Sequence, residues 1–328
     1  MRYLRNSSTD AHYNMAFDEF CLERLELAEP LFYLWQNAPA VIIGQNQNAY
    51  AEVNLPFLEA KGIMLARRMT GGGAVYHDLQ NLNYSIVGRA DDLERNFPDY
   101  LTLVIDALKQ LGVPAALSGR NDILVEGRKV SGYAKRGWRD RIMIHGTLMY
   151  DVDIDTLSRV LKVSAEKMEV HGVASVKSRV ANLKDYLPGL SSVKALQAAL
   201  EEILSRGHQD EEVILSDVQL ACIREMTRTK FATWDWNYGR SPHADIQRKK
   251  RFACGTIEAA LSIEHGVLTD LAFSGDFLGN RSVDSLIPKL KGARLTAACL
   301  AEALQGEAVS AWFDGLSEEA FIGLLIGG

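Results

Sequence analysis

The segment ARRMTGGGAVYHDLQNLNYSIV, from Ala66 to Val87, passes from two arginines through three glycines into a pattern typical of strands. Each glycine in regular structure costs roughly 0.5–1 kcal/mol relative to alanine, because glycine loses more backbone freedom on folding. Three in a row at Gly71–Gly73 therefore indicate a place where the backbone itself must be bare. The segment predicts a strand that delivers the loop at Arg68 and another strand that resumes from Ala74.

Two interpretations of this loop are open from the residues alone. Glycines allow the phosphates of a ligand to lie against backbone N–H groups, and Arg67 or Arg68 would add charge-assisted hydrogen bonds to the same anion. A tight turn or a bulge between strands explains the glycines as well. The loop differs from a phosphate loop because no GK[ST] follows it, and from a dinucleotide-binding loop because a strand rather than a helix follows.

Periodicity on both sides of the loop predicts a chain that mixes helices and strands. Apolar residues at helical spacing indicate a helix over Tyr13–Leu27, with Asn14 or Asp10 as its cap. Glu126–Gly127 marks a turn between two strands. Further strands are expected within Leu31–Trp35, Ala40–Gly44, Ile63–Met69, Gly73–Asp78, Leu82–Gly88, Gly119–Arg136 and Arg141–Val152, and further helices within Leu55–Gly62, Phe97–Gly112, Asp153–Val163 and Ser192–Gly207, with an irregular basic segment over His171–Gly189.

A change of composition predicts a second, smaller unit at the C-terminal end. TWDWNYGRSP, Thr233–Pro242, is followed by the polar run HADIQRKKR, which suggests a hinge or linker. From about Phe252 the chain alternates as two strands around a turn at His265–Gly266, and two or three helices follow. The pattern is typical of a small α+β domain.

Composition narrows the class of protein. The 328 residues are 47% apolar and 24% charged, with a formal net charge of −6, which is ordinary for a globular chain and unfavourable for general nucleic-acid binding. The N-terminus does not resemble a signal peptide, and no apolar run approaches the roughly 20 residues that span a bilayer. Four cysteines without a CxxC spacing favour a reducing cytoplasm.

The block GRNDILVEGRKVSGYAKR contains the next candidate residues. Strand alternation places Lys129 and Ser131 on one face and Arg128, Val130 and Gly132 on the other. Lys129 would clamp a phosphate and a carboxylate together if it faces inward. Taken alone, it is more typical of a solvated lysine on a strand.

Two further pairs of residues interrupt the strand patterns. Asn121 and Asp122 precede a strand, where Asp122 could hold Mg²⁺ or a ligand hydroxyl, or simply start the strand. His145 and Gly146 interrupt an apolar strand, and a core histidine explains the first of them equally well.

Together these motifs resemble those of lipoate–protein ligases. RRMTGGGAVYHD is similar to the family's RRxSGGGAV[FY]HD loop, and GRNDILVEGRKVSGYAKR to its GRNDxxxxGRKVSGxAxR block. WQNAPAVIIGQNQNAYAEVN, HGTLMYDVDIDTLSRVL, SVKSRVANLKDYLP and TWDWNYGRSP match further family stretches in the same order. Thr70 stands where the family motif has serine, which keeps the hydroxyl.

The resemblance implies a fold, domains and an activity. The fold would be the α+β biotin/lipoate ligase-like catalytic domain, a mixed sheet flanked by helices, over residues 1–245, with a small α+β accessory domain over residues 246–328. The enzyme would use ATP and Mg²⁺ to convert lipoate to lipoyl-AMP and pyrophosphate. It would then transfer the lipoyl group to a lysine of apo lipoyl domains of 2-oxoacid dehydrogenase complexes or of the glycine cleavage H protein. A monomer that binds neither nucleic acid nor membranes is expected.

The resemblance also implies roles for residues. Lys129 would be the catalytic residue that bridges the lipoate carboxylate and the α-phosphate. Asp122 would serve Mg²⁺ or the nucleotide, with Asn121 beside it. The lipoate and ATP site would comprise Arg68, Gly72, Gly73, Ala74, Val75, Tyr76, His77, Asn121, Asp122, Lys129, Ser131, His145 and Gly146.

Alternatives of the same fold are an octanoyl- or lipoyl-transferase that works without ATP, and an enzyme that only transfers preformed lipoyl-AMP or hydrolyses the lipoyl amide. The absence of cysteine between Cys21 and Cys222 argues against a transferase with a thiol nucleophile. A non-catalytic binder would not need Lys129 with the full loop, and a biotin ligase would carry a GRGRxG-type loop. No GxSxG motif and no zinc-ligand spacing is present.

Overall fold

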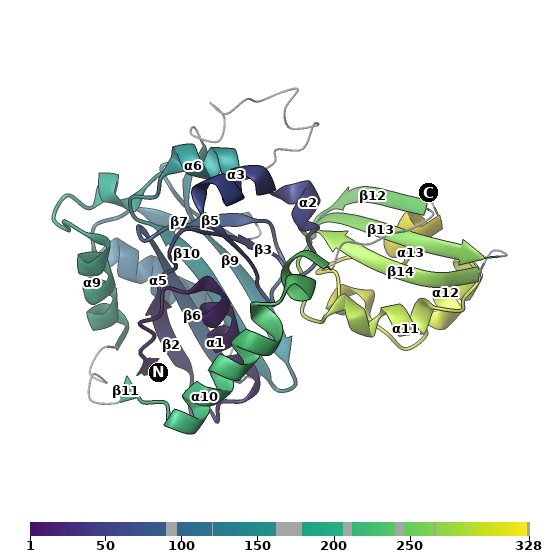
Figure 1. The fold of residues 1–328 in the computed structure, drawn as a ribbon, viewed down its shortest axis with the longest axis horizontal. Coiled ribbons are helices and arrows are strands. Elements are labelled where there is room, and N and C mark those ends of the chain that lie inside the picture. The colour runs from purple at the N-terminus through teal and green to yellow at the C-terminus, as the bar shows by residue number, and fades with distance from the viewer. Residues whose placement is uncertain are drawn as a thin grey trace.

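The computed structural model describes residues 1–89, 97–119, 121–161, 179–205, 212–239, 246–264 and 267–326. Within these residues the chain forms a larger body built on a mixed sheet and a smaller C-terminal body with its own antiparallel sheet (Figure 1). The α+β class expected from the sequence is confirmed.

The larger body is organised around an eight-stranded sheet in the order β11-β1-β2-β6-β10-β9-β8-β7. The pairs on either side of β1 are parallel, and the pairs from β2 to β7 are antiparallel. The strands are β1 (Arg2–Leu4), β2 (Leu31–Trp35), β6 (Asn81–Arg89), β7 (Ala115–Ser118), β8 (Asp122–Val125), β9 (Arg128–Trp138), β10 (Arg141–Met149) and β11 (Glu212–Val213).

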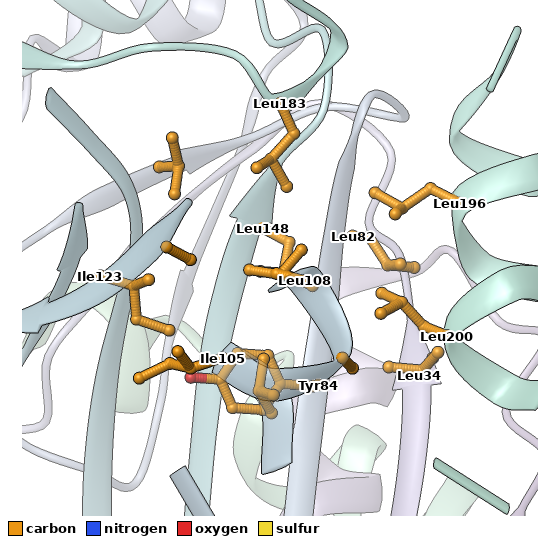
Figure 2. Packing of buried hydrophobic residues seen from close by; sticks show 14 of the residues in the cluster. Leu34, Leu82, Tyr84, Ile105, Leu108, Ile123, Leu148, Leu183, Leu196 and Leu200 are labelled. Atoms are coloured by element: carbon orange, nitrogen blue, oxygen red, sulfur yellow. The ribbon is translucent and has the colours of Figure 1, made fainter. Parts of the chain in front are cut away.

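Helices cover both faces of this sheet, because its central strands carry apolar residues on both sides. Helices α5 (Phe97–Gln110) and α9 (Val193–Ser205) cover one face. In Figure 2, Leu108 of α5 and Leu200 of α9 lie among side chains of the strands, such as Tyr84. Apolar side chains fill this face of the sheet completely. Polar candidate residues can therefore gather only on the opposite face.

The opposite face is covered by α1 (Ala11–Glu23) and α10 (Asp217–Met226). The side chain of Asp10 accepts the N–H of Tyr13, so Asp10 is the cap of α1. The helix ends at Glu23, before the predicted end at Leu27, since Arg24 already leaves helical geometry.

A second sheet of the larger body carries the glycine loop. In this sheet β3 (Ala40–Ile43) lies between β4 (Met64–Arg67) and β5 (Val75–His77). Its outer side packs on α3 (Leu55–Lys61) and α6 (Ile154–Val160), and α2 (Ala49–Glu52) lies beside them. Since β4 enters the loop and β5 leaves it, the predicted strand–loop–strand arrangement is confirmed. Short helical turns complete the body at Leu183–Tyr186, Thr227–Phe231 and Asp235–Gly239.

The C-terminal body has an antiparallel sheet and an apolar core of its own. Its buried core residues, including Phe273, Phe313 and Phe321, all come from residues 254–325. Its elements are β12 (Ile246–Phe252), β13 (Gly255–Glu264), β14 (Val267–Gly275), α11 (Ile287–Leu290), α12 (Ala297–Ala303) and α13 (Glu318–Ile326), with short turns at Val283–Ser285 and Val309–Ala311.

The predicted linker over HADIQRKKR is wrong for its second half. Ile246–Phe252 is strand β12, which pairs with β13, while residues 243–245 lie outside the described part of the chain. An edge strand keeps its charged side chains in water, so a strand can look like a polar linker in sequence. The predicted turn at His265–Gly266 also lies outside the described residues, although Glu264 pairs with Val267 on either side of it.

The remaining hairpin prediction is confirmed. Glu126 and Gly127 both have positive φ angles, 51° and 77°, as a two-residue turn between β8 and β9 requires. Among the described residues, no helix is long and apolar enough to cross a membrane.

Candidate active site

A cleft lies between the glycine loop and the face of the large sheet that α1 covers. It encloses about 630 Å³, counting the part open to solvent, which is within the range of small-molecule sites. The loop side contributes Arg68, Gly72 and Val75, and the sheet side contributes Lys129 and His145. The glycine loop and strands β9 and β10, which are far apart in the sequence, therefore face each other across one cavity.

The side chain of Arg68 lies inside the glycine loop and fixes its conformation by hydrogen bonds. Its Nη2 donates to the carbonyl oxygens of Gly71 (2.7 Å) and Gly73 (2.8 Å), and its Nε donates to Oγ1 of Thr70 (3.1 Å). Burial lowers the pKa of Arg68 to about 10, which leaves the guanidinium charged at neutral pH. Arg68, which the sequence analysis assigned to ligand binding, therefore also fixes the conformation of the loop.

This arrangement fixes the direction of the loop amides. In a trans peptide, the N–H of the next residue points opposite to the carbonyl, and the chain has no cis peptide bond among its described residues. Because the Gly71 and Gly73 carbonyls face Arg68, the N–H groups of Gly72 and Ala74 point away from it. The N–H of Gly72 donates to the carbonyl oxygen of Phe277 in the C-terminal body (3.2 Å).

The three glycines are not equivalent. Gly72 has φ of +93°, and a Cβ there would lie 2.9 Å from Nη2 of Arg68. A Cβ on Gly71 would lie 2.5 Å from the carbonyl oxygen of Phe277, whereas one on Gly73 would find nothing nearer than Cβ of Asp276 at 4.0 Å. Gly71 and Gly72 are therefore required by close packing, and Gly73 has free space around it.

Arg67 has a different task from Arg68. It is fully buried, and its guanidinium donates to the carbonyl oxygens of Gly44, Gln45, Trp236 and Asn237 among others. It is not among the residues that line the cleft. Of the two arginines that the sequence offered for an anion, Arg67 instead joins the segment after β3 to the segment before the C-terminal body.

Lys129 lies on the sheet side of the cleft, beside Asp122. Its Nζ is 2.7 Å from Oδ1 of Asp122, and the two side chains are 36% and 37% exposed. A Cβ on Gly132 would lie 2.9 Å from this Nζ, so the lysine lies directly over Gly132. The side chain of Asn121 donates to the carbonyl oxygen of Tyr133 (2.9 Å), which holds the start of β8 against β9.

A bulge in β9 corrects the predicted alternation. Ile123 pairs with Ser131, but Leu124 pairs with Lys129, so Val130 is an extra residue in β9. Lys129 therefore lies on the same face as Gly132. Simple alternation had placed it on the face of Ser131, and that prediction is wrong. Ser131 is fully buried and is not among the residues that line the cleft.

His145 is part of a buried chain of hydrogen bonds that starts at α1. Its Nδ1 lies 2.7 Å from Oδ2 of Asp18, and its Nε2 lies 2.7 Å from Oγ1 of Thr70. The other oxygen of Asp18 accepts the hydroxyls of Tyr33 (2.6 Å) and Ser85 (3.0 Å). Both ring nitrogens of His145 are engaged, so it faces the cleft with its ring and anchors the start of the glycine loop.

His77 has one ring nitrogen left over. Its Nδ1 lies 3.0 Å from Nδ2 of Asn37, while its Nε2 is buried and has no hydrogen-bond partner among the residues that the structure describes. Burial, followed by the charges of Arg68 and His145, lowers the pKa of His77 to about 3. The ring is therefore neutral and lines the cleft.

The structure brings most of the expected site residues together. Those that line the cleft are Arg68, Gly72, Gly73, Ala74, Val75, His77, Asn121, Lys129, His145 and Gly146. Tyr76 does not line it but packs in the core under α3 and α6, because it alternates with Val75 and His77 on β5. Burial raises the pKa of the Tyr76 hydroxyl to about 12. Asp122 does not line the cleft either, but its carboxylate lies beside it, paired with Lys129.

Sequence reasoning missed the apolar end of the cleft. Met15, Trp35 and Ile42 line it together with Asn83, and none of them belongs to a glycine-rich or charged motif. Asp18 was also missed, although a carboxylate on the apolar face of a helix, three residues after Met15, is a detectable signal of a buried partner.

Known proteins are similar to this chain along its whole length. The lipoyl protein ligase A/B catalytic domain matches residues 10–205, and the bacterial lipoate protein ligase C-terminus matches residues 241–325. The chain is 37% identical to lipoate-protein ligase LplJ of Bacillus subtilis, over 99% of this chain and 100% of that protein.

Solved structures agree with this likeness. LipL1 of P. falciparum in complex with lipoate has a TM-score of 0.76 at 22% identity, over 99% of this chain and 98% of that one, which is a likeness of fold. A structure from the archaeal lipoylation system of Thermoplasma acidophilum, a bipartite lipoate protein ligase and its E2 lipoyl domain, has a TM-score of 0.65 at 30% identity, over 75% of this chain and 98% of that one. Lipoate-protein ligase A bound with ATP has a TM-score of 0.64 at 30% identity, over 73% and 98%.

Proposed function

The chain belongs to the lipoate–protein ligase family, and we propose that its cleft makes lipoyl-AMP and passes the lipoyl group to a lysine of an acceptor protein. It is an ATP-dependent ligase. In the first step a lipoate carboxylate oxygen attacks the α-phosphorus of ATP, and pyrophosphate leaves. In the second step the acceptor amine attacks the acyl carbonyl, AMP leaves, and an amide remains after the amine loses a proton.

One observation supports this assignment most directly. The cationic end of the cleft, at Lys129, and its apolar end, at Trp35, are lined by the same continuous sheet, with the glycine loop above. An acyl-adenylate has an apolar chain and an anionic mixed anhydride, and it needs both kinds of surface at once.

Lys129 acts on the reacting atoms in this proposal. As a compact cation it draws the lipoate carboxylate and the α-phosphate together, and it then stabilises the oxyanion formed during aminolysis. Its partner Asp122, 2.7 Å away, orients the ammonium group over Gly132 before the ligand arrives. The β9 bulge supports this role because it turns Lys129 into the cleft.

The glycine loop binds the adenylate through its backbone. Arg68 fixes the carbonyls of Gly71 and Gly73 on one side, so the N–H of Ala74 is directed away from the guanidinium and toward the ligand. Backbone donors of this kind bind anions without side-chain entropy costs.

Mg²⁺ fits the residues at the polar end. Mg²⁺ in nucleotide sites uses one or two carboxylates, with phosphate oxygens and water as the other ligands. Asp122 offers one partly exposed carboxylate beside the cleft, and Asn121 offers an amide next to it. When bound, the ion would neutralise charge on the phosphates while Asp122 holds it.

We also assign the acceptors, the compartment and the domains by proposal. Apo lipoyl domains and the glycine cleavage H protein are the acceptors, supported by the lipoyl-domain partner of the Thermoplasma ligase. A reducing cytoplasm is supported by four free cysteines, and a monomer is the simplest assembly. Residues 1–245 form the catalytic domain and residues 246–328 the accessory domain, supported by the separate C-terminal core.

A transferase with a thiol nucleophile finds less support. Among the described residues that line the cleft there is no cysteine, and Cys21 is fully buried, with its thiol pKa raised by burial. A thiol with a raised pKa is a poor nucleophile at neutral pH.

The deciding experiment incubates an apo lipoyl domain or apo H protein with enzyme, lipoate and Mg-ATP, and measures the acceptor by mass spectrometry. A lipoyl mass shift that depends on ATP is expected. A shift only with synthetic lipoyl-AMP would identify a transfer-only enzyme, and a shift without ATP would identify a transferase.

The Lys129→Ala variant tests the role of the lysine. Lipoate-dependent exchange of pyrophosphate into ATP should fall about 100-fold or more, as when an oxyanion donor is removed elsewhere. Lys184→Ala is the matched control, because Lys184 pairs with Asp151 at 2.6 Å outside the cleft. Near-normal exchange in Lys129→Ala would overturn the assignment.

A further inference from the structure

A second cavity lies beside the cleft, between the large sheet and the C-terminal body. It encloses about 780 Å³, counting the part open to solvent. Tyr133 and Ala134 of β9 line both this cavity and the cleft. They directly follow Gly132, over which Lys129 lies, so the second cavity adjoins the cleft at the end where Lys129 is found.

The other wall of the second cavity comes from the C-terminal body. Ala253 and Cys254 contribute from the turn between β12 and β13, and Leu278 and Asp314 contribute from further along the chain. The N–H of Asp314 donates to the carbonyl oxygen of Leu278 (2.9 Å), which holds these two residues together. A group that enters here therefore passes between the two bodies of the enzyme.

The second cavity combines apolar walls with one pair of opposite charges. Ala134, Ala253 and Leu278 present hydrocarbon, which suits the aliphatic stem of a long charged side chain. Nζ of Lys135 lies 3.9 Å from Oδ2 of Asp314, and these side chains are 26% and 48% exposed. At this distance the ion pair is at the outer limit of a direct contact.

The carboxylate of Asp314 has room for a further cation. Among the residues that the structure describes, its side chain accepts no hydrogen bond, and its ion-pair partner is Lys135. A carboxylate can accept up to about four hydrogen bonds. An ammonium group has three N–H donors and no acceptor, so it is the chemical complement of this carboxylate.

Tyr133 connects the charge of the second cavity with those of the cleft. Burial, followed by the negative charges of Asp314 and Asp122, raises the pKa of its hydroxyl. Asp122 in turn pairs with Nζ of Lys129 at 2.7 Å. Tyr133 is therefore close both to the carboxylate of the second cavity and to the ion pair beside the cleft.

The second step of the proposed reaction brings a cation to a cationic site. The acceptor lysine arrives as an ammonium group, and Lys129 would repel it at close range. A carboxylate on the approach offsets this repulsion. Since the acyl-adenylate fills the cleft itself, the amine needs a separate way in that is wide enough for a lysine side chain.

We propose that the second cavity is the entrance through which the lysine side chain of the acceptor protein reaches the acyl-adenylate, and that Asp314 binds its ammonium group there. The proposal rests on the ligase function above and concerns only its second step. Asp314 exchanges its contact with Lys135 for the incoming ammonium, and the aliphatic stem lies along Leu278.

The transfer step then balances as follows from ordinary amine chemistry. The ammonium group gives one proton to water, and the free amine attacks the acyl carbon. A carbon–nitrogen bond forms, the bond from that carbon to the phosphate oxygen breaks, and AMP leaves with the electron pair. The nitrogen loses a second proton to water, and the amide remains.

The first test compares the two half-reactions in Asp314→Asn. Transfer from synthetic lipoyl-AMP to an apo lipoyl domain is followed over time by mass spectrometry, and activation is followed by lipoate-dependent pyrophosphate exchange. We expect kcat/KM for transfer to fall about 10-fold more than the exchange rate does, the size of a lost hydrogen bond to a charged group. Asp270→Asn is the matched control, because Asp270 pairs with Lys291 at 3.1 Å on the same body and does not line the cavity. Unchanged transfer in Asp314→Asn would overturn the proposal.

The second test separates a binding role of Asp314 from a structural role of its ion pair. Asp314→Asn and Lys135→Met both break this pair, so a structural role predicts similar losses of transfer in the two variants. A binding role predicts no such loss in Lys135→Met, because that change removes the competitor for the carboxylate. We expect kcat/KM for transfer in Lys135→Met to equal or exceed that of the unchanged enzyme. A loss as large as that in Asp314→Asn would refute the assignment of Asp314.

The third test narrows the second cavity at its rim. Ala253 is exposed on the turn between β12 and β13, so Ala253→Trp adds bulk there without removing a polar group. Transfer to the lipoyl domain should slow more than exchange does. Ala298→Trp is the matched control, because Ala298 is also exposed on the C-terminal body, on α12, and does not line the cavity. Equal losses of exchange and transfer in Ala253→Trp would show that the cavity serves pyrophosphate instead of the amine.

The outcomes separate this entrance from the ligase function. Absence of both exchange and transfer in the unchanged enzyme would refute the ligase assignment itself. Transfer at the unchanged rate in Asp314→Asn and in Ala253→Trp, with exchange intact, would refute only the entrance. If Asp314→Asn does not fold, Ala253→Trp on its exposed turn still decides.

Discussion

Thr70 shows how a single hydroxyl links the loop to the sheet. It accepts from Nε of Arg68 (3.1 Å) and lies 2.7 Å from Nε2 of His145, and His145 in turn is held by Asp18. Because Asp18 belongs to α1 and His145 to β10, the start of the loop is positioned by two elements that are distant in sequence.

Thr70→Val is therefore expected to be more harmful than its size suggests. It would leave Nε2 of His145 unpaired, at about 1–3 kcal/mol, and would remove one of the two acceptors of Nε of Arg68, which also donates to the carbonyl oxygen of Gly71 (3.2 Å). Thr70→Ser keeps the hydroxyl. We expect Thr70→Val to lower the free energy of unfolding and the rate of pyrophosphate exchange, with Thr70→Ser close to the unchanged enzyme. Urea unfolding and exchange assays on both variants measure this, and identical behaviour would show that the hydroxyl has no structural role.

His77 makes the stability of the protein depend on pH. Its pKa is about 3 in the folded protein and about 6.5 in the unfolded chain. Between these values the unfolded chain binds a proton that the folded protein does not, so stability falls as the pH falls below 6.5, by about 1.4 kcal/mol per pH unit from this group.

His77→Gln removes the titration and keeps a donor. The free energy of unfolding of the unchanged protein should drop more between pH 7.5 and pH 5.5 than that of the variant. Urea unfolding at the two pH values measures the difference. Parallel losses in both proteins would mean that His77 is not buried in its neutral form.

The glycine loop between β4 and β5 is shaped by the groups that pack on each side of it. Arg68 fills the inside, and residues 276–278 of the C-terminal body cover the outside. The two crowded positions are Gly71 and Gly72, where even the methyl group of alanine would be too close to its neighbours.

Gly72→Ala should destabilise the protein by about 1–3 kcal/mol, because of its positive φ and the contact with Arg68. Gly73→Ala is the matched control and should stay within about 0.5 kcal/mol. Thermal unfolding of the two variants in the absence of ligand measures this. A Tm for Gly72→Ala equal to that for Gly73→Ala would show that the loop relaxes freely.

The two apolar cores of the molecule are joined through the active-site loop. The N–H of Gly72 donates to Phe277, the N–H of Gly275 donates to Asn46 (2.8 Å), and the side chain of Gln45 donates to Ser282 (3.0 Å). The C-terminal body therefore contacts the segments that shape the cleft.

The proposed boundary between residues 245 and 246 has a direct test. All the buried residues of the C-terminal core come from residues 254–325, so a fragment of residues 246–328 should fold by itself. Circular dichroism should show a cooperative thermal transition for this fragment. A fragment without such a transition would mean that the second core depends on the first.

Much of the local structure could be predicted from the sequence. Periodicity gave the strands on both sides of the loop, the hairpin at Glu126–Gly127 and the helix around α5, because these features depend on residues close together in the chain. The linker over Ile246–Phe252 was wrong because an edge strand satisfies its charges in water, and local polarity does not reveal pairing with β13.

Residue types in a fixed order were enough to identify the family, the glycine loop and Lys129 as the leading catalytic candidate. The face on which Lys129 lies followed only from the pairing of β8 with β9, because one extra residue in β9 reverses the alternation. The tertiary structure also separated Arg67 from Arg68, and it showed that Gly71 and Gly72, but not Gly73, lack space. Contacts between strands and helices that lie far apart in the chain also produce the hydrogen-bonded chain of Asp18, His145 and Thr70. The same kind of contact buries the side chains of His77 and Asn83 at the cleft.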